Sequence, residues 1–286
     1  MSGVSHRLSS GRLVTAAVAI AALVAACGSN STQPSTSTSP GAGAPVNVAL
    51  AFQPAGTSTL TWDPQTKNVT AKLQMAGFTP GSTHAMHIHQ GSCAATGDVI
   101  VPFPDVTADA GGAINTTVTS SQPAPGGLAT GTALNMHLAS GAQLGGPGAL
   151  GYTPIACADI VAAPTTTLTM APVGEKPQGS ASLTYDSGKK TLTVTTTASG
   201  LAPGSSHAQH IHLGTCNAQG AVKYPLNDLV ASPSGSAETT TVIQNAEAPP
   251  ASGWYLNIHL GSSGQIEQNG QPTLYFQPII CGNVGK

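Results

Sequence analysis

The sequence predicts an all-β protein made of two tandem Greek-key β-barrel or sandwich domains. Charged residues make up 7% of the 286 residues, against roughly 25% in average soluble proteins, and the small polar residues that replace them suit strands and turns. Segments 46–52, 68–75 and 191–195 alternate in polarity, and turn clusters such as 63–65 and 186–188 separate such segments. Many short strands with frequent turns are typical of this fold class.

A long repeat divides the chain into two copies. His207 follows His84 by 207 − 84 = 123 residues, and the other distinctive residues of the first copy have partners at nearly the same separation. A repeat of this length that occurs only twice indicates tandem globular domains and not a solenoid. We place the domains at about 46–163 and 166–286. The matched residues are His84, His87, His89, Cys93, His137 and Cys157 in the first copy and His207, His210, His212, Cys216, His259 and Cys281 in the second.

The N-terminal segment predicts export and anchoring. Residues 1–26 have a basic start followed by an apolar run, which is the layout of a secretory signal. The end of that run resembles the lipobox of bacterial lipoproteins, which implies cleavage before Cys27 and lipid on its thiol; the alternative is a plain signal peptide with an incidental cysteine. Residues 27–45 have the Ser/Thr/Pro composition of a flexible linker. We therefore expect a protein that is secreted across the cytoplasmic membrane and lipid-anchored to the cell envelope.

The spacing of the histidines predicts a metal site in each copy. In a strand, residues i and i+2 point to the same face, roughly 6.6 Å apart, so His87 and His89 lie side by side with Ile88 turned into the core. Two imidazoles at this separation can share a metal ion, because each metal–nitrogen bond is roughly 2 Å long. A third histidine from another strand completes a three-nitrogen site with an open position.

The cysteines and the charge balance narrow the class of protein further. Apart from Cys27, the cysteines fall as one couple in each copy, which is typical of disulfides in an oxidising compartment, although four cysteines allow three connectivities. Both arginines lie in the N-terminal segment, so the chain without it carries seven lysines and eleven acids, a balance of 7 − 11 = −4. This balance does not favour nucleic-acid binding, which requires basic patches.

The combined His and Cys spacing resembles copper/zinc superoxide dismutase, and the His-Ile-His and Asn-x-His elements resemble the CHRD domain of exported proteins. The first resemblance implies an eight-stranded Greek-key barrel and one disulfide within each domain, Cys93–Cys157 and Cys216–Cys281. It implies that His84 and His207 support the site by hydrogen bonding. It implies two sets of copper ligands, His87, His89 and His137 in the first copy and His210, His212 and His259 in the second.

The chain departs from the dismutase pattern in two ways. No histidine lies between His89 and His137 or between His212 and His259, so the bridging ligand is missing and we expect no dedicated zinc site. The arginine that guides superoxide in that family is replaced by Pro154 in the first copy and by Pro278 in the second. The net negative charge also offers no attraction for an anion.

Three functions remain open. The first is a lipid-anchored protein that binds copper ions in both domains without efficient catalysis. The second is a copper-dependent superoxide dismutase, whose activity we expect to be weak because the guiding arginine and the bridging histidine are missing. The third is a metal-free structural or adhesion module, in which the histidines only bond to backbone carbonyls. The sequence does not specify the oligomeric state.

Overall fold

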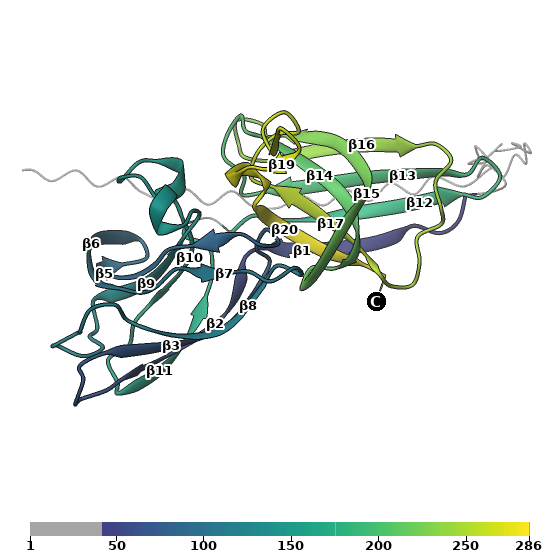
Figure 1. Cartoon of the computed structure of the whole chain (residues 1–286). Coiled ribbons are helices and arrows are strands. Elements are labelled where there is room, and N and C mark those ends of the chain that lie inside the picture. The colour runs from purple at the N-terminus through teal and green to yellow at the C-terminus, as the bar shows by residue number, and fades with distance from the viewer. Residues whose placement is uncertain (1–41, 175, 286) are drawn as a thin grey trace, which may run out of the picture. The chain divides into compact units, whose positions relative to one another are not determined.

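The computed structural model describes residues 42–174 and 176–285 (Figure 1). The predicted signal peptide, Cys27 and most of the predicted linker lie outside these residues. No helix in the described part of the chain is long and apolar enough to cross a membrane. The strands form two lobes, and the predicted all-β fold is confirmed.

Lobe 1 is built from eight principal strands in two four-stranded sheets, ordered β10-β9-β5-β6 and β11-β2-β3-β8. An antiparallel bridge between Cys157 and Ala171 joins the two sheets. The neighbours β3–β8 and β5–β9 are not consecutive in the chain, which is the crossover expected of a Greek key. The elements are β2 (Ala55–Trp62), β3 (Val69–Ala76), β4 (Thr83–His84), β5 (Met86–Ser92), β6 (Ala95–Pro102), β7 (Val106–Thr107), β8 (Ala113–Thr119), β9 (Thr132–His137), η1 (Gly141–Gln143), η2 (Leu150–Tyr152), β10 (Pro154–Asp159) and β11 (Thr165–Met170).

Lobe 2 repeats this arrangement as one eight-stranded sheet, in the order β15-β14-β17-β20-β1-β12-β13-β16. Its elements are β1 (Val46–Phe52), β12 (Gln178–Asp186), β13 (Thr191–Ser199), β14 (Ser206–Thr215), β15 (Ala218–Val230), β16 (Ala237–Ile243), β17 (Trp254–His259), β18 (Glu267–Gln268), β19 (Gln271–Pro272), η3 (Leu274–Phe276) and β20 (Pro278–Val284).

The two lobes exchange one strand. β1 precedes the strands of lobe 1 in the chain, yet it pairs with β12 and β20 of lobe 2, for example Val48 with Ala181. β11 pairs with β2 of lobe 1 along its whole length, and Leu168 faces Ser58. The boundaries predicted at 46–163 and 166–286 mark the two copies of the sequence repeat. The sheets do not follow these boundaries, because β1 joins lobe 2 and β11 joins lobe 1.

Both exchanged strands bury apolar side chains in the lobe that receives them. Val48 and Leu50 of β1 are 3% and 4% exposed and belong to the core of lobe 2. Leu168 and Met170 of β11 are equally buried in the core of lobe 1. The core of each lobe therefore includes residues from the other copy of the sequence repeat.

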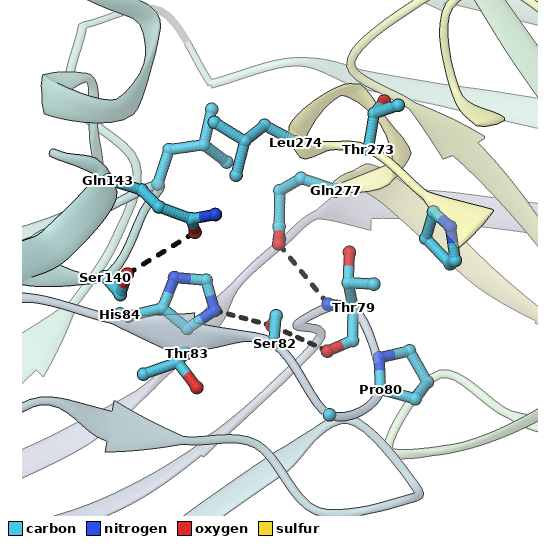
Figure 2. Close-up of a pocket in the computed structure, with 13 residues that line it drawn as sticks. Thr79, Pro80, Ser82, Thr83, His84, Ser140, Gln143, Thr273, Leu274 and Gln277 are labelled. Carbon is cyan, nitrogen blue, oxygen red and sulfur yellow. Dashed lines mark hydrogen bonds between the residues drawn. The ribbon is translucent and has the colours of Figure 1, made fainter. Parts of the chain in front are cut away.

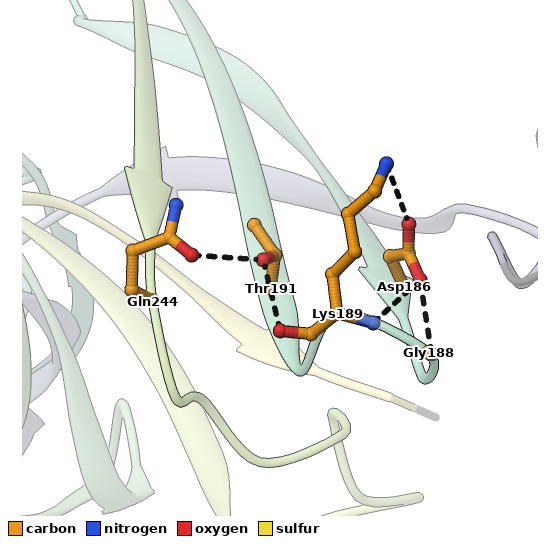
Figure 3. Close-up of polar contacts among 5 residues, drawn as sticks. All are labelled: Asp186, Gly188, Lys189, Thr191 and Gln244. Atoms are coloured by element: carbon orange, nitrogen blue, oxygen red, sulfur yellow. Dashed lines mark hydrogen bonds and ion pairs between the residues drawn. The ribbon is translucent and has the colours of Figure 1, made fainter.

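The predicted turn at 186–188 follows β12 and shows how polar side chains shape these connections (Figure 3). The Asp186 carboxylate accepts hydrogen bonds from the backbone N–H groups of Gly188 and Lys189, both at 3.0 Å. The Lys189 ammonium lies 3.2 Å from the same carboxylate. Thr191, at the start of β13, donates to Gln244 at 3.1 Å and so ties the turn to the end of β16. The turn thereby fixes the register of β12 and β13.

One disulfide closes each lobe, with the pairing that the resemblance implied. Cys93 follows β5 and bonds to Cys157 of β10, and Cys216 follows β14 and bonds to Cys281 of β20. The sequence separations are 64 and 65 residues. In the chain-entropy model a loop of this length makes each disulfide worth roughly 4 kcal/mol. Each disulfide also holds the end of a His-x-His strand against the last strand of its sheet.

Candidate metal centres

The three histidines of lobe 1 lie on one face of two paired strands. His87 and His89 of β5 stand opposite Asn135 and Ala133 of β9. His137 lies two residues beyond Asn135 and so shares this face. The intervening side chains of both strands point into the core, as the His-x-His spacing predicts. One nitrogen from each of the three histidines lies within 4.8 Å of one nitrogen of each of the others.

Backbone carbonyls fix which nitrogens point to the centre of this triad. His89 Nδ1 lies 2.9 Å from the carbonyl oxygen of Gly97, and His137 Nδ1 lies 2.8 Å from that of Tyr152. A carbonyl oxygen only accepts, so each Nδ1 carries the proton and donates, and each Nε2 keeps its lone pair. The two Nε2 atoms are 3.4 Å apart. His87 Nδ1 is buried beside them without a hydrogen-bond partner, so three ring nitrogens converge on one point.

Lobe 2 repeats this arrangement with His210, His212 and His259. His212 Nδ1 donates to the carbonyl of Gly220 at 3.0 Å, and its Nε2 is buried without a partner. His259 Nδ1 donates to the carbonyl of Phe276. His210 Nδ1 lies 3.1 Å from His259 Nε2. The same set of nitrogens, one Nδ1 and two Nε2, therefore faces the centre in both lobes.

His84 and His207 stand behind the triads and have both ring nitrogens engaged. His84 Nδ1 donates to the backbone carbonyl of His137 at 2.9 Å, and its Nε2 lies 2.7 Å from Ser82 Oγ. His207 makes the equivalent contacts with the carbonyl of His259 and with Ser205 Oγ, at 2.9 and 2.6 Å. These positions agree with the supporting role that the resemblance implied. The assignment of ligands and supports stays a prediction until a metal is bound.

Burial lowers the pKa of five histidines of the two triads, namely His87, His137, His210, His212 and His259. Desolvation lowers the pKa of His87 and of His210 to about 4. His137 and His89 lower that of His87 further, and His212 lowers that of His210, because like charges repel. Desolvation likewise lowers the pKa of His259 to about 3. Such rings are unprotonated at pH 7. A neutral imidazole keeps the lone pair that a metal ion requires.

The family model of the CHRD domain matches residues 25–146 and 161–266. The chain belongs to the CHRD domain family. No curated protein matches the chain. Among solved structures, it is similar to the P104H mutant of the SOD-like protein from Bacillus subtilis, with 15% identity, a TM-score of 0.31, and coverage of 38% of this chain and 90% of that one.

The charges around both triads of this CHRD protein are negative. The negative charge of Asp105 raises the pKa of His84 and His87, and that of Asp228 raises the pKa of His207 and His210. In each case the lowering of the pKa by burial is the larger effect. No arginine occurs in the described residues. A carboxylate beside a site of neutral imidazoles attracts a cation and repels an anion.

The prolines at the predicted arginine positions lie directly beside the triads. Pro154 begins β10 opposite His137, and Pro278 begins β20 opposite His259. Their rings provide neither a hydrogen-bond donor nor a positive charge there. The two CHRD lobes therefore share a histidine geometry that could hold a metal ion, and neither proline supplies a cationic group beside it.

The aromatic side chains around the triads differ between the two CHRD lobes. Tyr255 stacks on His212 with ring centroids 4.9 Å apart, whereas lobe 1 has Ala133 at the position facing the corresponding histidine. Tyr152 lies 4.7 Å from His137 in lobe 1, where lobe 2 has Phe276 beside His259. His87 is partly exposed, while all three histidines of the second triad are buried. The first site is therefore the more open of the two.

Sequence reasoning missed the two glycines whose carbonyls orient His89 and His212. Gly97 and Gly220 are separated by 220 − 97 = 123 residues, which is the spacing of the histidine repeat. A Cβ atom at Gly220 would lie 2.5 Å from the carbonyl oxygen of Leu213, and one at Gly97 would lie 3.0 Å from that of Gln90. The close approach of neighbouring strands explains the glycines. Their spacing, which matches that of the histidines, was the feature of the sequence from which they could have been identified.

Proposed function

We propose that this CHRD protein binds one copper ion in each lobe, through His87, His89 and His137 in lobe 1 and through His210, His212 and His259 in lobe 2. One observation carries the proposal. In each triad the nitrogens that face one another are those left without a carbonyl partner, and two of them, His87 Nδ1 and His212 Nε2, are buried with no hydrogen-bond partner at all. Buried polar atoms are rarely left unpaired unless a ligand satisfies them.

The donor set favours copper over zinc. Three neutral imidazoles without a carboxylate or a thiolate suit copper, and the affinity order of divalent ions places copper above zinc. Bound copper would supply one-electron chemistry, because it cycles between Cu(I) and Cu(II). The protein's own contribution is to hold the three nitrogens in place and, through burial, to keep His87, His210 and His259 unprotonated at pH 7. Asp105 and Asp228 add a local attraction for a cation.

Superoxide dismutation is the second candidate function, since three imidazoles leave an open position on the metal. The surroundings oppose it. The side chains opposite His137 and His259 are prolines, and the charges beside the triads are carboxylates. We expect copper-dependent activity far below that of an enzyme that steers its anionic substrate with a positive charge.

We further propose that the protein is exported and held in the cell envelope by a lipid on Cys27. The support is the sequence alone, namely the apolar run that ends at Cys27. Replacing Cys27 with Ser, or treating cells with globomycin, should move the protein out of the membrane fraction. Unchanged fractionation would exclude lipid anchoring and would leave the copper proposal intact.

Copper stoichiometry tests the central proposal. The mature chain, purified without a tag and loaded with copper, should retain two copper ions, and His89→Gln or His212→Gln should each remove one. The exposed neighbour Gln90 provides a matched control, because Gln90→Ala on the same strand should retain both ions. A superoxide assay on the loaded protein separates the first two functions. Failure to retain copper would instead leave the metal-free structural or adhesion module.

A further inference from the structure

Two glutamine side chains of lobe 2 form hydrogen bonds with the backbone of one loop of lobe 1. Gln219 donates from Nε2 to the carbonyl of Phe78 at 2.9 Å. Gln277 donates to the carbonyl of Gly77 at 3.0 Å. It also accepts from the backbone N–H of Thr79 at 3.3 Å (Figure 2). Gln219 is 9% exposed and Gln277 is 2% exposed. We call this pair the glutamine clamp.

Each glutamine of the clamp is next in the chain to a carbonyl that orients a histidine of the second triad. Gln219 precedes Gly220, whose carbonyl accepts from His212 Nδ1 at 3.0 Å. Gln277 follows Phe276, whose carbonyl accepts from His259 Nδ1. A shift of either glutamine backbone therefore moves a carbonyl that holds one of the two Nε2 ligands of lobe 2.

The loop bound by the clamp contacts, through Ser82 at its far end, the residues that support the first triad. The ring of Phe78 lies 4.9 Å from that of His84. Ser82 Oγ lies 2.6 Å from the carbonyl of Thr79 and 2.7 Å from His84 Nε2 (Figure 2). His84 in turn donates to the backbone carbonyl of His137 at 2.9 Å. A continuous series of short polar contacts therefore joins the backbone behind His137 to the backbone behind His259.

The clamp is built from lobe 2 only. The repeat places Thr96 at the position of Gln219 (219 − 96 = 123) and Thr153 at that of Gln277 (277 − 153 = 124). Thr96 bonds to Ser92 and Asn135, and the carbonyl of Thr153 accepts from Leu138, all within lobe 1. General strand geometry does not account for this difference, because the two lobes share a topology. At these two pairs of matched positions, the long amide side chain is present only in lobe 2, where it reaches the other lobe.

We propose that Gln219 and Gln277 are positioning residues that couple the two histidine triads, so that a metal ion in one lobe raises the affinity of the other. This inference rests on the proposed function. A metal ion in lobe 2 fixes His212 and His259, and with them the two carbonyls beside the clamp. The loop from Gly77 to Ser82 is then already ordered when the first triad is filled, so less conformational entropy is lost in the second step. Coupling of binding free energies is reciprocal, so the order of filling does not matter.

Anaerobic Cu(I) titration against a chromophoric chelator tests the coupling. The double variants His87→Gln/His89→Gln and His210→Gln/His212→Gln each leave one triad intact and give its intrinsic binding constant. For the full chain, the product of the two stepwise constants should exceed the product of the two intrinsic constants by about fivefold or more, the lower end of typical coupling. This comparison needs no change at the glutamines.

The clamp variants then assign the coupling to its residues. Gln219→Met and Gln277→Met keep the side-chain length and remove the hydrogen bonds. In each variant the ratio of the product of the stepwise constants to the product of the intrinsic constants should fall close to one, while the intrinsic binding constants change little. Gln265→Met is the matched control, because Gln265 is exposed and its side chain bonds only to Ser262 of lobe 2. Sites that bind Cu(I) independently in the full chain would overturn the coupling alone. Coupling that survives both clamp variants would overturn the role of the glutamines. Absence of Cu(I) binding at both triads would overturn the proposed function itself.

Discussion

At the scale of single residues, the main feature is that backbone carbonyls determine the tautomer of four of the six candidate ligands. His89, His137, His212 and His259 each donate from Nδ1 to a carbonyl, which leaves Nε2 free. Such outer contacts orient a ligand before the metal arrives, and their loss typically weakens metal binding 10- to 100-fold. The His-x-His pairs were predictable because their spacing is local in the sequence, whereas the distant His137 and His259 came from the family resemblance. The carbonyl partners were not predictable, because they depend on how neighbouring strands approach.

Gly220→Ala should weaken copper binding in lobe 2 about tenfold. The added Cβ would lie 2.5 Å from the carbonyl oxygen of Leu213, so the Gly220 carbonyl must move away from His212. Chelator competition on the variant that has only the second triad measures the change. Gly264→Ala is the control, since nothing lies within 4 Å of its added Cβ. Unchanged affinity in Gly220→Ala would show that this carbonyl does not position the ligand.

The stability of the metal-free protein should rise with pH between about 4 and 6.5. In the unfolded chain each histidine is protonated below its ordinary pKa of about 6.5, whereas burial lowers the folded-state pKa of His84, His87 and His210 to about 4. The unfolded state therefore binds more protons in this window, and the free energy of unfolding increases as pH rises through it. Urea denaturation at a series of pH values measures the slope, which His87→Gln/His210→Gln should reduce. A constant free energy of unfolding across this window would contradict the lowered pKa values of His84, His87 and His210 in the folded state.

At the scale of elements, the exchange of β1 and β11 is the feature that sequence reasoning did not predict. Both segments alternate in polarity, so each fits a hairpin with the strand that follows it equally well as the exchanged pairing. The pattern determines that residues 46–52 form a strand, but it does not determine which sheet the strand joins. The glutamine clamp was missed for the same reason, because a polar residue in a β segment gives no sign of the lobe that it contacts.

Leu50→Ala should destabilise lobe 2, although Leu50 lies in the first copy of the repeat. The side chain is 4% exposed in the core of lobe 2, and large-to-small changes at such sites cost about 2–5 kcal/mol. Leu168→Ala is the matched change, with its effect in lobe 1. Hydrogen exchange should increase in β12 and β20 for the first variant and in β2 for the second. The opposite assignment would mean that each strand pairs within its own copy.

At the scale of the whole molecule, shared strands should make the two lobes unfold together. Each lobe contains one tryptophan, Trp62 in β2 and Trp254 in β17, and these are the two tryptophans of the sequence. The variants Trp62→Phe and Trp254→Phe therefore report on one lobe each. Their fluorescence transitions in urea should coincide, as expected for a single cooperative unit. Two transitions with clearly different midpoints would show that the exchanged strands do not link the stability of the lobes.

X-ray absorption spectroscopy of the copper-loaded chain tests the central claim most directly, because it reports the atoms bound to the metal. If the triads are the binding sites, each copper should show three imidazole nitrogens at about 2 Å, and the double variants His87→Gln/His89→Gln and His210→Gln/His212→Gln should each halve the copper content without changing the spectrum of the remaining ion. Copper bound mainly by oxygen or sulfur, or a spectrum unaffected when both triads are removed, would contradict the account.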